Sequence, residues 1–213
     1  MLIIDDNSPD GTAAIVEGLI AGNNDRLHIL KRPAKQGLAG AYLAAFEWGI
    51  SKNYDVFLEM DADFSHNPEY IPEMLKHIQN HDAVIGSRNV RGGGVQGWPI
   101  RRNFVSKCGS LYSSIVLGCP VRDLTGGFNM WTKNSLLKIG MRKIISKGYS
   151  FQVEMKYRAW RSGCSIKEIP ILFTDRKWGK SKMSSKIFFE ALINMWKIKL
   201  SVGGDTSLDQ FIK

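Results

Sequence analysis

In residues 54–68, YDVFLEMDADFSHNP, an apolar run ends in two carboxylates and a polar turn. The run is typical of a buried strand, and Asp61 and Asp63 follow it directly. Asp, Ser, Asn and Pro are also common in turns and helix caps, so one interpretation is that the pair simply ends the strand. The other is a metal site, because carboxylates two positions apart at a strand end point the same way and suit a divalent cation that also binds substrate phosphates.

Short apolar runs and helical patterns alternate on both sides of this stretch. Strands are predicted in residues 1–6, 27–31, 54–63 and 82–87, and helices in residues 11–22, 38–51 and 68–80. This order predicts an α/β fold with a mostly parallel sheet covered by helices, in which ligands bind at the carboxyl ends of the strands. The acidic pairs Asp5/Asp6 and Asp61/Asp63 both fall at such ends, which favours a metal or nucleotide site over a simple turn.

A glycine-rich segment, residues 88–103 (RNVRGGGVQGWPIRRN), opens the second half of the chain. Gly92, Gly94 and Gly97 have the spacing of a dinucleotide-binding motif, but the segment does not sit directly at a strand-to-helix turn, and Trp98 and Pro99 interrupt it. We therefore expect a mobile loop and no dinucleotide site.

The remaining pattern predicts three helices, one strand and a tail. The first helix, residues 101–117, carries Phe104, Cys108, Leu111 and Ile115 on one stripe, which we expect to face the core. The other elements are a helix in residues 150–163, a strand in residues 165–173, a helix in residues 186–200 and a frayed tail in residues 201–213.

Composition and charge narrow the class of protein. The chain has 213 residues, 44% hydrophobic and 23% charged, which is typical of one globular domain. Residues 1–82 hold 13 acidic and 6 basic residues, whereas residues 83–213 hold 7 acidic and 23 basic residues. The basic half therefore indicates an anionic partner: phosphate groups, nucleic acid or an anionic membrane face.

The cysteines and the apolar runs indicate the cellular environment that we expect for the protein. Cys108, Cys119 and Cys164 are widely spaced and form no CxxC pair, so we expect reduced thiols in a cytosolic environment. The first residues are followed at once by two aspartates, so we expect neither a signal peptide nor a membrane span there. No later apolar run approaches the ~20 residues that a span needs.

Seven motifs occur in an order and spacing that resembles the dolichyl-phosphate (polyprenyl-phosphate) mannose synthases, members of glycosyltransferase family 2 with the GT-A fold. They are IIDDNSPDGT, DADFSHNP, GSR, GGGVQGWPIRRNFVSKCGSLY, DLTGGF, SKGYSFQVEM and DRKWGKSKMS. The resemblance runs from Met1 to about Leu200 and implies a single GT-A domain over residues 1–200. In it, residues 1–88 would bind donor and metal, and residues 89–200 would face the acceptor and the membrane.

The resemblance implies a donor site for GDP-mannose with Mg²⁺ or Mn²⁺. Asp61 and Asp63 match the DxD element of the family, with Ala62 between them, and would hold the metal against the diphosphate. Asp6 matches the nucleotide-binding acid of the family. Its neighbour Asp10 is interpreted as a helix cap before Thr12. Arg176 and Lys182 are predicted to bind the donor as well, because guanidinium and ammonium groups neutralise phosphate charge.

The implied acceptor is dolichyl or polyprenyl phosphate, which is already ionised near neutral pH. Such a nucleophile needs orientation and charge shielding but no strong base. Arg88 and Arg101, with Ser65, are therefore predicted to bind the acceptor phosphate, and Asp63, Arg88 and Arg101 are predicted to be catalytic. Arg102 would point elsewhere on a helix and is expected at the surface.

Two further residues have open interpretations. The resemblance makes Glu154 a site residue, although an ion pair to a nearby arginine is an equally physical account. His66 follows the DxD element and could line the site. His77 and His81 are four residues apart, but without a third ligand they indicate a solvated helix face.

The basic segment near the end of the chain indicates a membrane surface. Residues 176–199 hold seven basic residues against the single acid Glu190, beside Phe188, Phe189 and Trp196. A cationic helix with aromatic residues can lie in a lipid headgroup layer, whereas the alternative is a core helix with basic ends. We expect peripheral attachment to the cytosolic face of a membrane, with small transmembrane partner subunits and no nucleic acid.

The sequence also departs from the family pattern. Family members begin with an earlier strand, a P-T-Y-N-E turn and a helix, so we expect the sheet and the nucleotide site of this chain to be incomplete. Asn129 stands where the family commonly has arginine. Three rival hypotheses remain: transfer of glucose or another sugar from a UDP donor, a basic α/β domain for nucleic acid, and a catalytically inactive remnant.

Overall fold

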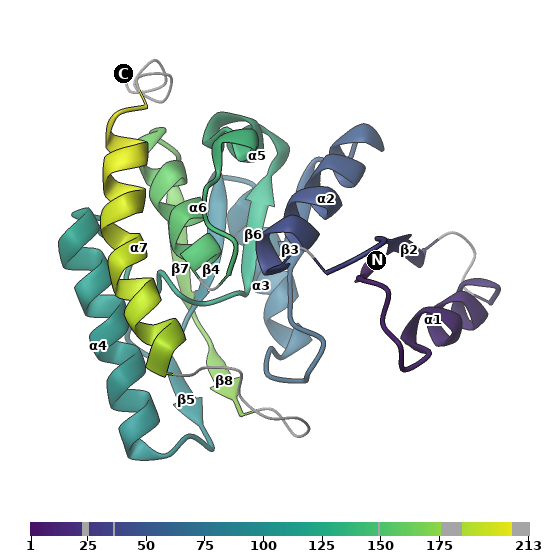
Figure 1. The fold of residues 1–213 in the computed structure, drawn as a ribbon, viewed down its shortest axis with the longest axis horizontal. Coiled ribbons are helices and arrows are strands. Elements are labelled where there is room, and N and C mark those ends of the chain that lie inside the picture. Colours follow the sequence, from purple (N-terminus) through teal and green to yellow (C-terminus); the bar gives the residue numbers. More distant parts are fainter. Residues whose placement is uncertain (23–25, 36, 149, 176–184, 206–213) are drawn as a thin grey trace. The chain divides into compact units, whose positions relative to one another are not determined.

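The computed structural model describes residues 1–22, 26–35, 37–148, 150–175 and 185–205 (Figure 1). It contains two compact units, Met1–Asn53 and Tyr54–Lys213, which are considered separately below. The units divide at residue 53, whereas the sequence separates donor and acceptor functions at residue 88. The single domain over residues 1–200 stays a prediction.

The first unit consists of two strand–helix pairs. Its elements are β1 (Leu2–Asp5), α1 (Thr12–Ile20), β2 (His28–Lys31) and α2 (Gly37–Ser51). The two strands pair in parallel, with Leu2 opposite His28 and Asp5 opposite Lys31. All four elements were predicted, and Asp5 lies at the carboxyl end of its strand as expected.

The second unit is built on a four-stranded sheet. Its strand order is β3 (Val56–Glu59), β6 (Asn129–Thr132), β4 (Ala83–Ser87) and β7 (Ile166–Pro170). β6 runs antiparallel to both of its neighbours, and β4 and β7 are parallel. The carboxyl ends of β3 and β4 and the amino end of β6 therefore meet at one edge of the sheet. This edge carries the Asp61 loop, Arg88 and residues 123–128.

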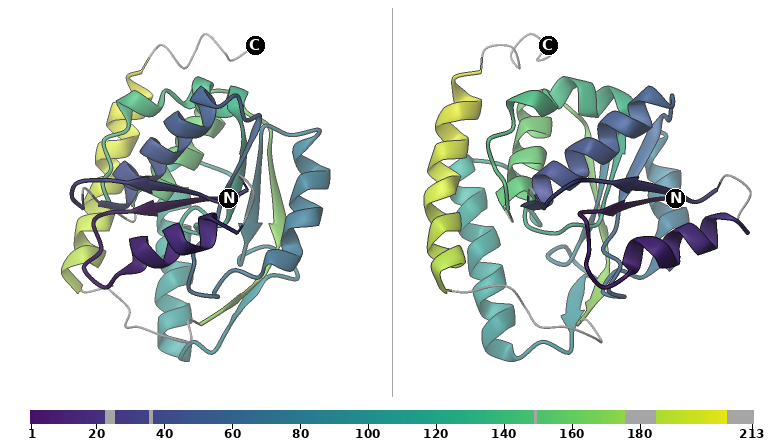
Figure 2. Two further views of the ribbon diagram at one scale, coloured as in Figure 1. Left: turned by 90° about the vertical axis from the view of Figure 1, so that its right-hand side faces the viewer. Right: turned by 45° about the vertical axis from the view of Figure 1, so that its right-hand side comes forward.

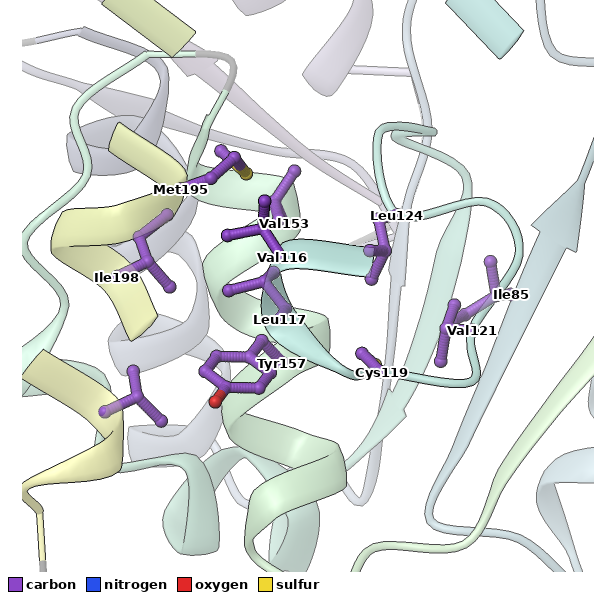
Figure 3. Packing of buried hydrophobic residues seen from close by; sticks show 11 residues of the cluster. Ile85, Val116, Leu117, Cys119, Val121, Leu124, Val153, Tyr157, Met195 and Ile198 are labelled. Atoms are coloured by element: carbon purple, nitrogen blue, oxygen red, sulfur yellow. The ribbon is translucent and has the colours of Figure 1, made fainter. Parts of the chain in front are cut away.

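Helices cover both faces of this sheet. Val84 packs in one cluster with Met74 and Ile78 of α3 (Ile71–Ile78), which follows a short 3₁₀ helix, η1 (Pro68–Tyr70). The next residue, Ile85, belongs to the opposite cluster, as the alternation of side chains along a strand requires. In that cluster, Val153 and Tyr157 of α6 (Ser150–Arg161) face Met195 and Ile198 of α7 (Ser185–Gly203), as Figure 3 shows. α7 ends three residues beyond its predicted end.

The expected core stripe of α4 (Ile100–Leu117) is exposed, and that prediction is wrong. Phe104, Leu111 and Ile115 are 67%, 62% and 71% exposed. The buried face holds the small residues Ser110 and Ser113 and the last turn of the helix. Small side chains allow this face to approach its neighbours closely, and α4 packs beside α7 in the views of Figures 1 and 2.

The structure also contains elements that the sequence did not predict. β5 (Gly94–Gln96) pairs in parallel with β8 (Leu172–Thr174), so the expected mobile loop is partly a strand. A Cβ atom at Gly93 would lie 2.4 Å from the carbonyl oxygen of Ser87, so only glycine fits there. α5 (Lys133–Ile139) and the 3₁₀ helix η2 (Met141–Lys143) follow β6.

Two expectations from composition can be compared with the structure. Within the described residues, no helix has the length and apolarity to cross a membrane. Cys108, Cys119 and Cys164 are all free. Burial raises the pKa of Cys119 to about 11 and that of Cys164 to about 12, so both thiols stay protonated at neutral pH.

Candidate active site

The predicted metal-binding pair lies in a tight loop directly after β3. The main-chain N–H of Asp61 donates to Nδ1 of His66 at 3.1 Å, while the Asp61 side chain is exposed. Oδ1 of Asp63 accepts from both the N–H and the hydroxyl of Ser65. Phe64, between them, has φ 65°, a left-handed conformation that is uncommon for a bulky residue. These bonds fold the loop back on itself, with Ala62 exposed between the two aspartates.

His66 fastens this loop to the rest of the unit. Its buried ring stacks on Phe128 at 5.0 Å between ring centroids and meets the edge of Phe173 at 5.4 Å. Burial, and then the charge of Arg88, lowers the pKa of His66 to about 4, so the ring is neutral at pH 7. Because Nδ1 accepts from Asp61, the ring proton sits on Nε2. The sequence indicated that His66 could line the site but missed this supporting role.

Arg88 is held by a buried carboxylate that the sequence did not single out. Oδ2 of Asp123 accepts from the main-chain N–H of Arg88 at 2.9 Å and from Nε at 2.7 Å, and Oδ1 accepts from Nη2 at 2.7 Å. Although burial raises the pKa of Asp123, the Arg88 charge more than offsets it and holds that pKa well below its usual range. Among the described residues, Nη1 of Arg88 makes no hydrogen bond, so one edge of the guanidinium is left for a ligand.

Arg88 also lies close to the loop that carries Asp61 and Asp63. Burial lowers the pKa of Arg88, but the neighbouring charge of Asp123 raises it more, so the pKa lies above its usual value. The negative charge of Asp61 adds to this rise, which places Asp61 near the guanidinium. The guanidinium carbon lies 5.5 Å from the ring centre of Phe173 and 5.9 Å from that of Trp98. The structure therefore brings Asp61, Asp63 and Arg88 together at one edge of the sheet, and their roles in binding metal and phosphate stay predictions.

The DLTGGF loop, residues 123–128, borders the same space. A Cβ atom at Gly127 would lie 3.8 Å from Oδ1 of Asp61, 3.9 Å from Cε1 of His66 and 4.0 Å from Nε2 of Gln152. Gly127 therefore brings the main chain of this loop next to the Asp61 carboxylate. A larger residue at this position would fill space beside Asp61.

A buried polar network lies beneath the two loops. Glu59, the last residue of β3, accepts from Nε1 of Trp131 and from Nε2 of Gln152, both at 2.6 Å. Oε1 of Gln152 in turn accepts from Nδ2 of Asn129 at 2.8 Å. Burial raises the pKa of Glu59, and these donors, together with Lys156, oppose the rise. Asn129, at the position where the resemblance leads one to expect arginine, is a buried neutral donor in this network.

Arg101 is not brought to this group by any contact. It is exposed on the first turn of α4, and no hydrogen bond or ion pair joins it to the described part of the chain. Its role in binding phosphate stays a prediction. Arg102, expected simply at the surface, is half-buried: its guanidinium lies 4.0 Å from the ring centre of Trp98, and Nη1 donates to Oδ1 of Asp175 at 3.1 Å.

The remaining donor-site predictions fall outside the second unit or outside the described residues. In the first unit, the Asp6 carboxylate pairs with Arg32, Oδ1 to Nε at 2.7 Å and Oδ2 to Nη2 at 3.2 Å. Asp10 accepts from the N–H and hydroxyl of Thr12, the first residue of α1, but the N-cap position itself is Gly11, so Asp10 binds the first turn from one residue before the cap. The predicted donor ligands Arg176 and Lys182 lie outside the described residues.

Glu154 forms the ion pair with an arginine that was the alternative interpretation of its sequence. It is fully buried and accepts from the main-chain N–H groups of Ile145 and Ser146 and from Nε of Arg158 at 2.9 Å. The ion pair to an arginine is therefore confirmed. With both carboxylate oxygens engaged inside the protein, Glu154 is better explained as a structural anchor than as a site residue.

The chemistry of the loop suits a hard divalent cation. Asp61 and Asp63 offer carboxylate oxygens, the ligands that Mg²⁺ and Mn²⁺ prefer. In the described ranges, no group of three or more His, Cys, Asp or Glu residues is arranged to hold an ion. Two carboxylates alone form an incomplete set, which fits a cation that also binds the phosphates of a substrate.

Comparisons of the sequence agree on one kind of enzyme. Residues 1–140 match Glycosyl transferase family 2. An undecaprenyl-phosphate mannosyltransferase of Micrococcus luteus is 45% identical over 195 residues, which cover 92% of this chain and 80% of that protein. A polyprenol monophosphomannose synthase of Mycolicibacterium smegmatis is 43% identical over 202 residues, covering 93% of this chain and 76% of that protein.

Comparisons of the structure support the predicted fold class. Glucosyl-3-phosphoglycerate synthase of Mycobacterium tuberculosis, solved with Mn²⁺, UDP and phosphoglyceric acid, matches with a TM-score of 0.61 and 13% identity over 95% of this chain and 67% of that one. The same synthase with Mn²⁺, UDP and glucosyl-3-phosphoglycerate gives a TM-score of 0.60. At this identity the likeness concerns the fold alone, and it confirms the GT-A α/β architecture.

Proposed function

The chain belongs to glycosyltransferase family 2 and is a glycosyltransferase, and on that premise we propose that it transfers mannose from GDP-mannose to a polyprenyl phosphate. The structural observation that carries the proposal is the approach of the Asp61 loop to Arg88 at one edge of the sheet. The names of the relatives at 45% and 43% identity support mannose as the sugar and a polyprenyl phosphate as the acceptor.

The residues of the site form two groups, one that acts on the leaving diphosphate and one that acts on the attacking acceptor phosphate. Asp61 and Asp63 would hold Mg²⁺ or Mn²⁺, which supplies positive charge to the diphosphate that leaves as GDP. Arg88, fixed by Asp123 and free at Nη1, orients the acceptor phosphate. An oxygen of that phosphate forms a bond to the anomeric carbon of mannose while the bond to the diphosphate breaks on the opposite side. This inverts the configuration.

The site has no need of a general base, because the acceptor phosphate is already ionised. The His66 ring lies beside the Asp61 loop, but it is neutral at pH 7 because its pKa is lowered to about 4, and its Nδ1 is engaged by the N–H of Asp61. We therefore assign His66 a role in supporting the loop and no role as a general base. This agrees with a nucleophile that arrives deprotonated.

A lipid acceptor requires contact with a membrane, and α4 and α7 offer a surface for it. Among the side chains that the structure describes, the exposed apolar residues of the two helices are Ile100, Phe104, Val105, Leu111, Ile115, Ile193, Trp196 and Leu200. Nε1 of Trp196 donates to the hydroxyl of Tyr112, which ties the helices together. Lys107 and Lys197 are exposed on the same helices and would meet anionic headgroups. Attachment to the cytosolic face and association with small transmembrane subunits belong to the same proposal.

The test is transfer of radiolabelled sugar to a short-chain polyprenyl phosphate in detergent. GDP-mannose with Mn²⁺ or Mg²⁺ should give a labelled lipid, and a chelator should abolish it. Parallel reactions contain UDP-glucose, and a salt titration with DNA and RNA accompanies them. Product from UDP-glucose alone would replace the donor in this proposal. No transfer, together with tight and steeply salt-dependent binding of nucleic acid, would replace the function.

A further inference from the structure

Lys156 is a fully buried cation on α6 with no part in the function described so far. Its Nζ donates to the main-chain carbonyl oxygens of Gly126 at 2.7 Å, Asp123 at 2.8 Å and Leu124 at 3.4 Å. All three acceptors belong to the DLTGGF loop. An ammonium has three N–H groups, so a single side chain holds three consecutive or nearly consecutive carbonyls turned toward the core.

We propose that Lys156 is a positioning residue for glycosyl transfer, which holds the DLTGGF loop so that Asp123 keeps Arg88 beside the metal-binding carboxylates. This inference rests on the proposed function for its kinetic consequences. Its structural part concerns only the loop and Arg88.

Asp123 is the link between Lys156 and the site. Its main-chain oxygen accepts from Lys156, while its carboxylate accepts three hydrogen bonds from Arg88. Gly126, the second strong acceptor of Lys156, donates its own N–H to Oδ1 of Asp123 at 3.0 Å. The ammonium therefore fixes the two ends of the turn that presents the carboxylate to Arg88.

The same loop also meets the metal-binding side of the site. Gly127 follows Gly126 directly and approaches Oδ1 of Asp61. A shift of the loop would therefore move Arg88 and change the space beside Asp61 at once. Misplacement of reacting groups by about 1 Å can lower a rate about 100-fold, so such a shift has a measurable effect on turnover.

An apolar side chain could fill the position of Lys156 but could not hold the loop. Other buried positions of α6, such as Val153, Met155 and Ala159, hold apolar side chains, so burial on this helix does not by itself require a charge. Burying an ammonium without a partner is costly, and here carbonyl oxygens and the nearby charges of Asp123 and Glu59 compensate it. What the ammonium adds is therefore the hold on the three carbonyls.

A second residue of α6 secures the other loop in the same way. Gln152 lies four positions before Lys156, on the same face of the helix. Its Nε2 donates to Glu59 at 2.6 Å, two residues before Asp61 in the chain. One face of α6 thus holds both the segment that leads to the metal-binding aspartates and the loop that positions Arg88.

The experiment compares Lys156→Met with Arg158→Met as a matched control. Arg158 is also a buried cation of α6, but it binds Glu154, Asp205 and the carbonyl oxygen of Lys143, away from the loop. Both substitutions remove a buried charge and should lower the melting temperature. Below both melting temperatures, Lys156→Met should lower kcat by about 10- to 100-fold with little change in the KM for GDP-mannose, and Arg158→Met should not.

A double substitution separates positioning from general damage. If Lys156 acts chiefly through Arg88, then Lys156→Met should lower kcat by a clearly smaller factor in the Arg88→Ala background than in the parent, and the remaining loss comes from the space beside Asp61. Effects that multiply would indicate that Lys156 acts independently of Arg88 and would overturn the proposal. Lys156→Gln, which keeps an amide donor, should lie between the parent and Lys156→Met, and it replaces Lys156→Met if that variant does not fold.

A spectroscopic readout does not depend on activity. The Nε–H of Arg88 is buried against Asp123, so its NMR signal in ¹⁵N-labelled protein can be assigned by its loss in Arg88→Lys. Lys156→Met or Lys156→Gln should shift or broaden this signal, and Arg158→Met should leave it in place. An unchanged signal in the Lys156 variants overturns the inference. Absence of mannosyl transfer by the parent protein would contradict the proposed function, and this signal would then decide the inference alone.

Discussion

Arg88 and Asp123 are 35 residues apart in sequence and share three hydrogen bonds, all 2.9 Å or shorter. The pair joins the end of β4 to the loop before β6, and both side chains are almost completely shielded from solvent. A buried ion pair of this kind is strongly disturbed when one partner is removed, because the other charge is left without compensation.

Asp123→Asn should therefore destabilise the second unit by about 3–5 kcal/mol. The expected change is measured as the free energy of unfolding in urea. Glu17→Gln serves as the control, because Glu17 pairs with Lys31 in a half-exposed ion pair. Such surface pairs contribute less than about 1 kcal/mol. Equal, small effects of the two substitutions would show that the Asp123 pair is not the buried anchor described here.

Asp61→Asn and Asp63→Asn should each abolish metal-dependent transfer while the fold stays intact. An amide keeps the shape of the side chain but removes the negative charge that a divalent cation requires. The measurements are mannosyl transfer and the rise in melting temperature produced by GDP with Mn²⁺. Glu73→Gln, an exposed acid on α3, is the control. Transfer within a few-fold of the parent would remove the metal role from these aspartates.

His66 should make the protein less stable in acid. Its pKa is about 4 in the folded protein, below the ordinary value of 6.5, so the unfolded chain binds the extra proton first. The contribution of the neutral His66 ring to the free energy of unfolding is therefore fully present above pH 6.5. It is lost as the pH falls toward 4, by about 3 kcal/mol in total.

The measurement is the free energy of unfolding of the parent and of His66→Gln at neutral and at acidic pH. Glutamine can still accept the N–H of Asp61, but it does not titrate in this range. The variant should lose less stability on acidification than the parent. Identical losses would show that His66 is not held neutral by its surroundings.

The sequence predicted the parts of this site that depend on local pattern. The strand pattern placed Asp61 and Asp63 at a strand end, Arg88 was chosen from the family resemblance and its charge, and the structure brings all three to one edge of the sheet. Asp123 and Lys156 were not identified, because their roles depend on partners about thirty residues away in sequence. Glu59 offered one local signal, an acid within an apolar strand, that could have indicated a buried polar network.

Periodicity also failed at α4 for a physical reason. It shows that Phe104, Leu111 and Ile115 share a face, but it does not show whether that face meets the core or the outside. In this helix the small residues Ser110 and Ser113 are on the packed side, and the apolar stripe is exposed. The sequence pattern also missed β5, because its partner strand β8 lies far along the chain.

The exposed stripe of α4 leads to the last prediction, which concerns membrane binding. Fully burying a large apolar side chain is worth about 1.5–3 kcal/mol, so three of them can change a partition coefficient by several orders of magnitude even if burial in the lipid is partial. Phe104→Ser, Leu111→Ser and Ile115→Ser together should therefore greatly weaken binding to vesicles that contain an anionic phospholipid.

The control and the charge dependence make this test specific. Leu137→Ser removes a similarly exposed apolar residue from a different helix, α5, and should leave vesicle binding unchanged. Lys107→Gln with Lys197→Gln should weaken binding to anionic vesicles by about 1 kcal/mol for each charge and have little effect on neutral vesicles. Because all of these side chains are exposed or partly exposed, the melting temperature should change little. If the triple variant of α4 binds anionic vesicles as tightly as the parent, the apolar stripe is not the membrane contact, and the lipid acceptor must reach the site by another surface.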